Sequence, residues 1–88
     1  MNQRRANIFG LGLIGGSLAA ALTSRGWHVT GNDVNTGAEE EALKLGIIAA
    51  RGIDADAEIS FVATPVSSVI DQVRKALSST SGLVTDVG

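Results

Sequence analysis

The chain has 88 residues, of which 44% are hydrophobic, and a formal net charge of −2. This length suits one compact domain, residues 1–88, and is too short for two, while the small negative charge offers no basic surface for nucleic acid or an anionic membrane. Because there is no cysteine, disulfides and thiolate metal sites are excluded and a cytoplasmic location is expected. The apolar stretches are interrupted by glycine before they approach the roughly 20 residues of a membrane span.

The first predicted elements are a strand, a glycine turn and a helix. Residues 6–9, "ANIF", favour a short buried strand, and Gly10 follows at once. From Ile14 onward, apolar residues recur at helical spacing, and Gly26 stands where a C-terminal cap belongs. We therefore expect the chain to pass directly from a strand into a helix through glycine.

A second strand and a second helix are predicted next. Residues 27–33, "WHVTGND", are rich in β-favouring side chains and end in a polar pair. Thr36 and Glu39 have the spacing of a capping box, and Gly46 marks the expected end of the helix. The glutamates at 39–41 should form a solvated first turn that favours the helix dipole.

The remaining elements complete an open sheet. Residues 46–50 form a weak third strand, 58–65 a clear one closed by proline, 66–77 a helix by apolar spacing, and 82–88 a last strand. Strands separated by helices cannot pair through tight hairpins and instead pair in parallel through right-handed crossovers. The predicted fold is α/β, a doubly wound and mainly parallel sheet of about five strands with helices on both faces.

The glycine turn carries the strongest functional signal. Gly10, Gly12 and Gly15 match G-x-G-x-x-G between a strand and a helix, as in Rossmann-type dinucleotide-binding domains. Gly10 permits the tight turn, Gly12 leaves room for a pyrophosphate, and Gly15 lets the helix pack closely on the sheet. The free N–H groups around Leu13 and Ile14, with the helix dipole, would hold the phosphates. The alternative is a strand–helix turn without a ligand.

An acidic residue follows at the expected place. Asp33 stands 18 positions after Gly15, at the end of the second strand. Its carboxylate can accept hydrogen bonds from both hydroxyls of an adenosine ribose and would repel a 2′-phosphate. Val34 and Asn35 provide no arginine for such a phosphate, so NAD is favoured over NADP. A solvated turn carboxylate is the alternative.

A second segment could face the cofactor. Thr64, Pro65 and Val66 lie at the carboxyl end of a predicted strand, the edge where open α/β sheets bind ligands. Thr64 could hydrogen-bond the cofactor, and Pro65 would turn the backbone across the nicotinamide side. A proline at the first position of an ordinary helix accounts for the same residues equally well.

The remaining reactive side chains predict no catalysis. His28, the one histidine, is expected at the surface at the start of a strand, without partners for a metal site. Ser17 and Ser24 are expected on a helix surface because neither has a candidate base nearby in sequence. We therefore predict no metal site and no catalytic residue from these positions.

Five segments together resemble a known family. In order and spacing, the chain from about residue 6 to residue 88 resembles the amino-terminal half of prephenate and arogenate dehydrogenases, enzymes of tyrosine biosynthesis, through the segments "GLGLIGGSLAAAL", "GND", "ALKLGII", "VATPV" and "LVTDVG". The resemblance implies an NAD(P)-dependent oxidoreductase that decarboxylates prephenate to 4-hydroxyphenylpyruvate, or arogenate to tyrosine, with the parent protein a homodimer. It also assigns cofactor contacts to Gly10, Gly12, Leu13, Ile14, Gly15, Asp33, Thr64, Pro65, Val66 and Asp86.

The resemblance also implies what residues 1–88 do not contain. In the family, "TDVG" continues into Ser-Val-Lys, and a later His-Pro segment supplies a histidine for the substrate hydroxyl; both would follow Gly88. We therefore expect a truncated nucleotide-binding domain, without the helical substrate and dimerisation domain and inactive alone. We also expect an exposed apolar edge on the last strand. A stand-alone NAD-sensing module is the alternative function.

Overall fold

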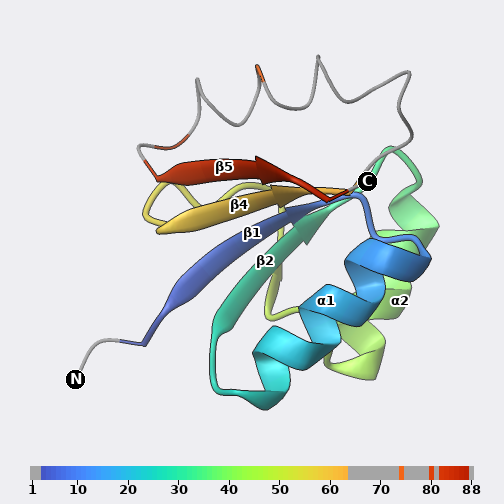
Figure 1. The fold of residues 1–88 in the computed structure, drawn as a ribbon. Helices are drawn as coiled ribbons and strands as arrows, with labels where there is room; N and C mark the ends of the chain where they lie inside the picture. The colour runs from blue at the N-terminus through green and yellow to red at the C-terminus, as the bar shows by residue number, and fades with distance from the viewer. Residues whose placement is uncertain (1–2, 64–73, 75–79, 81, 88) are drawn as a thin grey trace.

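Five parallel strands form one sheet at the centre of the molecule (Figure 1). The computed structural model describes residues 3–63, 74, 80 and 82–87. The strand order is β3-β2-β1-β4-β5, with β1 Arg5–Phe9, β2 His28–Asn32, β3 Ala50–Arg51, β4 Ile59–Val62 and β5 Leu83–Asp86. The predicted parallel α/β sheet is thus confirmed, with the third strand starting later than expected.

Both described helices lie against the same face of the sheet (Figure 1). Helix α1, Leu13–Ser24, contacts β1 and β2, and helix α2, Thr36–Leu45, contacts β2 and β3. A further helix was predicted for residues 66–77. Apart from Arg74, which is helical, that prediction falls outside the described residues.

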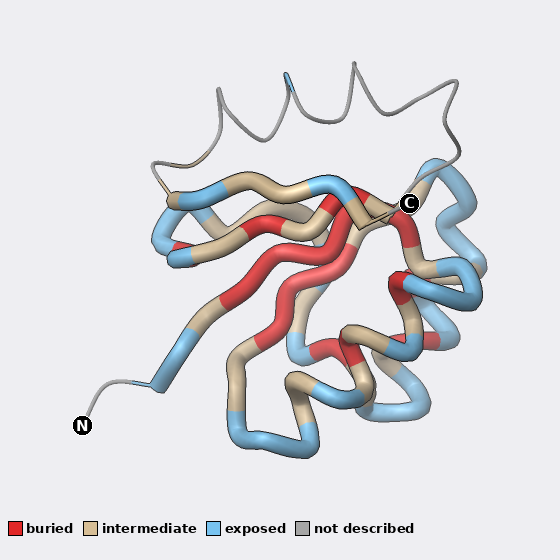
Figure 2. The backbone as a smooth tube through the Cα atoms, in the orientation of Figure 1, coloured by how far each residue is buried: buried red, intermediate tan, exposed pale blue. Residues whose placement is uncertain are grey.

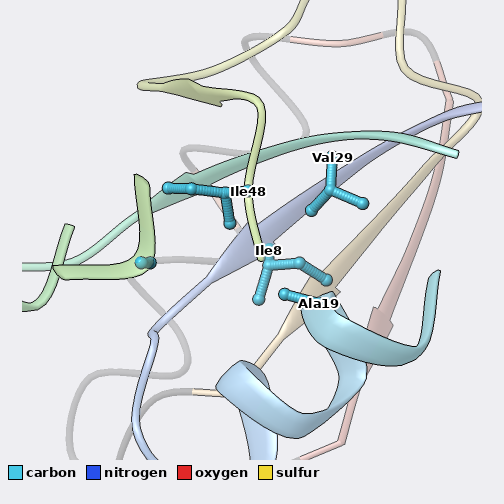
Figure 3. Packing of buried hydrophobic residues seen from close by; sticks show 5 residues of the cluster. Ile8, Ala19, Val29 and Ile48 are labelled. Atoms are coloured by element: carbon cyan, nitrogen blue, oxygen red, sulfur yellow. The ribbon is translucent and has the colours of Figure 1, made fainter. Parts of the chain in front are cut away.

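The main apolar core fills the space between the sheet and these helices. Ile8 and Val29 point from the two central strands toward Ala19 of α1 and Ile48 of the connection to β3 (Figure 3). Burying each larger aliphatic side chain contributes about 1.5–3 kcal/mol. Figure 2 shows that burial is concentrated in β1 and β2, because β1 is paired on both sides and both strands lie beneath α1.

The opposite face of the sheet carries a buried polar contact. Successive side chains of a strand point to opposite faces of the sheet. Because Ile8 faces the helices, its neighbour Asn7 in β1 points away from them. Its Oδ1 accepts from Asp54 N at 2.7 Å, and its Nδ2 donates to Asp54 O at 2.9 Å and to Ser60 Oγ at 3.1 Å. The Asn7 amide thereby fixes the loop before β4 against this face, beside a small apolar cluster of Phe9 and Val62.

The helix ends follow the glycine pattern only in part. Gly46, with a φ of +75°, caps the end of α2 as predicted, whereas the C-cap of α1 is Arg25 and Gly26, with a φ of +88°, follows it by one residue. At the start of α2, however, the capping residue is Asn35, whose Oδ1 accepts from Gly37 N at 2.9 Å. The predicted Thr36–Glu39 capping box is therefore wrong, and Glu39 uses its carboxylate elsewhere.

Candidate functional site

The turn after β1 and the turn after β2 meet at the carboxyl edge of the sheet. Gly10 N donates to Asn32 O at 2.8 Å, which extends the β1–β2 pairing by one step. Gly10 has a φ of +95°, a conformation that L side chains rarely adopt. The first glycine thus provides the tight turn that the sequence predicted, and it places the start of α1 beside the end of β2.

The next two glycines of the motif have opposite surroundings. A Cβ built on Gly12 would meet no atom within 4 Å, whereas a Cβ on Gly15 would overlap the carbonyl oxygen of Gly10 and lie 3.2 Å from the Cβ of Ala63. Gly15 is therefore required for close packing of α1 on the turn, as predicted. Gly12 borders open space, so a group outside the chain can reach the backbone there.

No side chain of the described residues caps or neutralises the N-terminus of α1. Its N-cap is Gly12, no side chain caps it, and its first turn contains no acidic residue. The first N–H groups of a helix have no partner within the helix and lie at the positive end of its dipole. Leu13 and Ile14 are 89% and 56% exposed, so this first turn lies at the surface. This helix start offers hydrogen-bond donors to an anion.

Asp33 lies directly beside the glycine turn. Its Oδ2 accepts from Leu11 N at 2.7 Å, and its Oδ1 accepts from Asn35 N at 2.9 Å. The carboxylate is thus fixed between the residue that follows Gly10 and the cap of α2. The structure brings together the two features that the sequence predicted to act on one ligand.

Two further charged residues reach this site, and sequence reasoning missed both. Glu39 is only 8% exposed; its Oε2 accepts from Asp33 N at 2.9 Å, and its Oε1 accepts from Arg51 Nε and Nη2 at 3.1 and 2.9 Å. The prediction of a solvated first turn is therefore wrong for Glu39, although Glu40 and Glu41 are exposed. Sequence spacing could not show that Glu39 pairs with Arg51, because Arg51 belongs to another element, β3.

Of the other predicted cofactor contacts, the structure describes only Asp86. Thr64, Pro65 and Val66 lie outside the described residues. Asp86 is exposed at the end of β5, opposite Val62 in the β4–β5 register. Asp86 is therefore at the same edge of the sheet as the glycine turn.

The remaining candidate side chains are His28, Ser17 and Ser24. His28 begins β2 at the amino edge of the sheet, as predicted, but it is half-buried rather than exposed. Ser17 and Ser24 are exposed on α1, where their hydroxyls donate to Leu13 O and Ala21 O, each at 2.7 Å. Both serines therefore behave as the predicted helix-surface residues.

Among the residues that the structure describes, the shifted pKa values belong to groups at the amino edge. The hydrogen bond with Glu58 raises the pKa of Arg4, and the same contact lowers the pKa of Glu58. Burial raises the pKa of Asp54, but the hydrogen bonds from the Arg5 side chain and from Asp56 N, with the charge of Arg5, outweigh it and leave that pKa lowered. These shifts reflect ion pairs that close the edge opposite the candidate site.

The described part of the chain has no cluster of metal-ligating side chains and no helix that could span a membrane. Within residues 3–63, 74, 80 and 82–87, no group of three or more His, Cys, Asp or Glu side chains could hold a metal ion. Over the same residues, neither helix has the length and apolar character needed to cross a membrane.

The chain matches a known domain family over most of its length. The model of the nucleotide-binding domain of prephenate dehydrogenase matches residues 18–88. The chain belongs to this family. A prephenate dehydrogenase of Bacillus subtilis (strain 168) is 37% identical over 103 aligned residues, which cover 100% of this chain and 27% of that protein. The resemblance seen in the sequence is thereby confirmed.

Solved structures agree with the assignment. Synechocystis arogenate dehydrogenase superposes with a TM-score of 0.88 and 31% identity, over 96% of this domain and 32% of that chain. Prephenate dehydrogenase from A. aeolicus, in complex with hydroxyphenyl propionate and NAD+, gives 0.84 and 25%, over 98% and 34%. A 3-hydroxyisobutyrate dehydrogenase of Mycobacterium tuberculosis, at 22% identity and 0.79, shares the fold. The domain spans about a third of the length of these relatives.

Proposed function

We propose that this domain binds NAD across the carboxyl edge of its sheet and forms the cofactor-binding part of a prephenate or arogenate dehydrogenase. The observation that carries the proposal is the uncapped start of α1 at Gly12, beside open space and next to the fixed carboxylate of Asp33. An anion-binding backbone and a hydroxyl-binding carboxylate are the two groups that an adenosine diphosphate requires.

The phosphate half of the ligand fits the glycine turn. The N–H groups at the start of α1, around Leu13 and Ile14, would donate to the pyrophosphate oxygens, and the open space at Gly12 admits them. Gly10 and Gly15 contribute indirectly, since they allow the turn and the close approach of α1 to the sheet.

The ribose half of the ligand fits Asp33. Each carboxylate oxygen accepts one backbone N–H, from Leu11 and Asn35, and an ionised carboxylate has further acceptor sites on both oxygens. These can accept the two adenosine ribose hydroxyls. The negative charge would repel a 2′-phosphate, which supports NAD rather than NADP.

The whole protein's reaction follows from the family and extends beyond these residues. The bound nicotinamide would accept a hydride as prephenate, or arogenate, loses carbon dioxide and becomes aromatic. We propose that the segment Thr64–Val66 and Asp86 face the nicotinamide side, and that the catalytic serine and histidine belong to segments following Gly88. Residues 1–88 alone should therefore bind the cofactor without turnover. A cytoplasmic homodimer is the proposed form of the parent enzyme.

Calorimetric titration of the 88-residue chain with NAD+ tests the proposal. Gly12→Val should leave the fold intact, since its Cβ meets nothing, yet weaken NAD+ binding more than about tenfold because the branched side chain occupies the phosphate approach. Gly16→Ala is the matched control, since its Cβ makes only an ordinary 3.6 Å contact with Leu11 O. Equal affinity of wild type and Gly12→Val would refute binding at this turn.

A further inference from the structure

We propose that Glu39 and Arg51 determine specificity at the adenosine ribose, by setting the charge that a 2′-phosphate meets. The inference rests on the proposed function, namely that a dinucleotide lies across Asp33. Neither residue is expected to contact NAD. Each acts through its own charge near the ribose end of the site: Glu39 adds a negative charge there, and Arg51 neutralises one.

The contacts join three charged residues into one group. Glu39 accepts from the backbone N–H of Asp33 through one oxygen, at 2.9 Å, and from Arg51 through the other, at 2.9 and 3.1 Å. Arg51 lies at the carboxyl end of β3, opposite Gly31 in the register with β2. A guanidinium from β3 is therefore held two hydrogen bonds away from the Asp33 backbone.

Glu39 compensates that guanidinium. The side chain of Glu39 is 11% exposed and that of Arg51 is 40% exposed, so the acid is largely withdrawn from water while the cation faces the solvent at this edge. With Asp33 and Glu39 negative and Arg51 positive, the group has a formal charge of −1 (−1 − 1 + 1). A 2′-phosphate therefore approaches a net negative group even though an arginine is part of it.

The two ends of the ion pair should have opposite effects on coenzyme choice. Glu39→Gln removes a negative charge and brings the group to 0 (−1 + 1), while the amide oxygen can still accept from Asp33 N. Arg51→Met removes the positive charge and brings it to −2 (−1 − 1). Water and salt weaken the interaction between charges near the surface of a protein. Each change should therefore alter the NADP+/NAD+ affinity ratio by only roughly 3- to 10-fold.

The experiment measures dissociation constants of NAD+ and NADP+ for the 88-residue chain at low and at physiological salt. Glu39→Gln should raise the relative affinity for NADP+, and Arg51→Met should lower it. The double variant, with the group at −1 again, should return to the wild-type ratio. Both shifts should shrink as salt screens them. Circular dichroism confirms that each variant is folded.

A structural role alone predicts a different result. Both single variants break the same ion pair, so a loss of rigidity would weaken both coenzymes in both variants and move the ratio in neither direction. Equal ratios in all four proteins, or shifts of the same sign, would overturn the inference while leaving NAD+ binding in place. If the wild type binds neither coenzyme, the proposed function fails, and the inference fails with it.

Discussion

The two edges of the sheet treat their charged and polar groups differently. At the amino edge, Arg4 forms a two-bond ion pair with Glu58, and its guanidinium lies 4.3 Å from the centre of the Trp27 ring. Arg5 pairs with Asp54 at 2.7 Å. These four charged side chains meet partners of opposite sign, so they are satisfied within the chain itself.

At the carboxyl edge, apart from the Glu39–Arg51 ion pair, backbone groups take the place of such side-chain partners. Asp33 is held by the N–H groups of Leu11 and Asn35, the start of α1 has no cap, and Leu13 and Val34 are 89% and 91% exposed. Apolar side chains at the surface and uncapped helix N–H groups both reduce the stability of a free domain. This edge therefore retains groups that a ligand can satisfy, whereas the amino edge uses its groups for folding.

The largest effect should come from closing the contact between the glycine turn and α1. Gly15→Ala places a Cβ against the carbonyl oxygen of Gly10, which is backbone and cannot rotate away. The helix must shift, and we expect a loss of about 3 kcal/mol in the free energy of unfolding. Urea denaturation followed by circular dichroism measures it.

The neighbouring glycine provides the control for this substitution. Gly16→Ala meets only Leu11 O at an ordinary 3.6 Å, and alanine is the better helix former, so stability should rise by about 0.5–1 kcal/mol. If both variants lost the same stability, the close approach at Gly15 would not be the cause. The carboxyl edge would then not depend on the packing of α1 against the turn.

The next prediction concerns Asn7, on the face of the sheet opposite the helices. Asn7→Ala removes both partners of the partly buried Asp54 backbone and the donor to the buried Ser60 hydroxyl. We expect a loss of about 2–3 kcal/mol, since unpaired buried polar groups retain their desolvation cost. Ser60→Ala, which removes one hydroxyl and leaves the Asn7–Asp54 pair, should cost less than half as much in the same denaturation experiment.

A smaller effect should separate the two candidate caps of α2. Asn35→Ala removes the acceptor for Gly37 N and should cost about 1 kcal/mol. Thr36→Ala, at an exposed position without a capping role, should cost less than about 0.5 kcal/mol. Thermal unfolding distinguishes them, and the reverse order would restore the capping box that the spacing predicted.

The strand–turn–helix order could be predicted because it depends on local patterns. The glycines at 10, 12 and 15 and the Asp33 that follows them have the spacing of the dinucleotide-binding pattern, which predicts a strand, a tight turn and a helix in that order. The parallel sheet then followed from the alternation of strands and helices. The resemblance to a family added the reaction, which local patterns could not supply.

The failures have a common physical cause, which is competition between local and distant partners. Glu39 has the right spacing for a capping box with Thr36, but the Asp33 backbone and Arg51 offer it stronger partners in a buried position. Asn7 in the middle of an apolar strand gave no sign of its partner, Asp54, because 47 residues separate them. Sequence spacing predicts neighbours within one element, whereas these contacts depend on the assembled sheet.

The smallest predicted effect concerns acid and the amino edge. The pKa of Asp54 in the folded chain is below its ordinary 3.8, so its stabilising contribution is present above the unfolded value and is lost as pH falls through the lowered one. Asp54→Asn should reduce stability at pH 7 by no more than about 1 kcal/mol, since Arg5 is partly solvated, and this difference from wild type should shrink between pH 5 and pH 2. Denaturant unfolding across that range measures it, with the exposed Asp56→Asn as a nearly neutral control. A difference that stays constant with pH would mean that the Arg5 pair does not stabilise this edge through its charge, and the contrast between the two edges would then lie in packing alone.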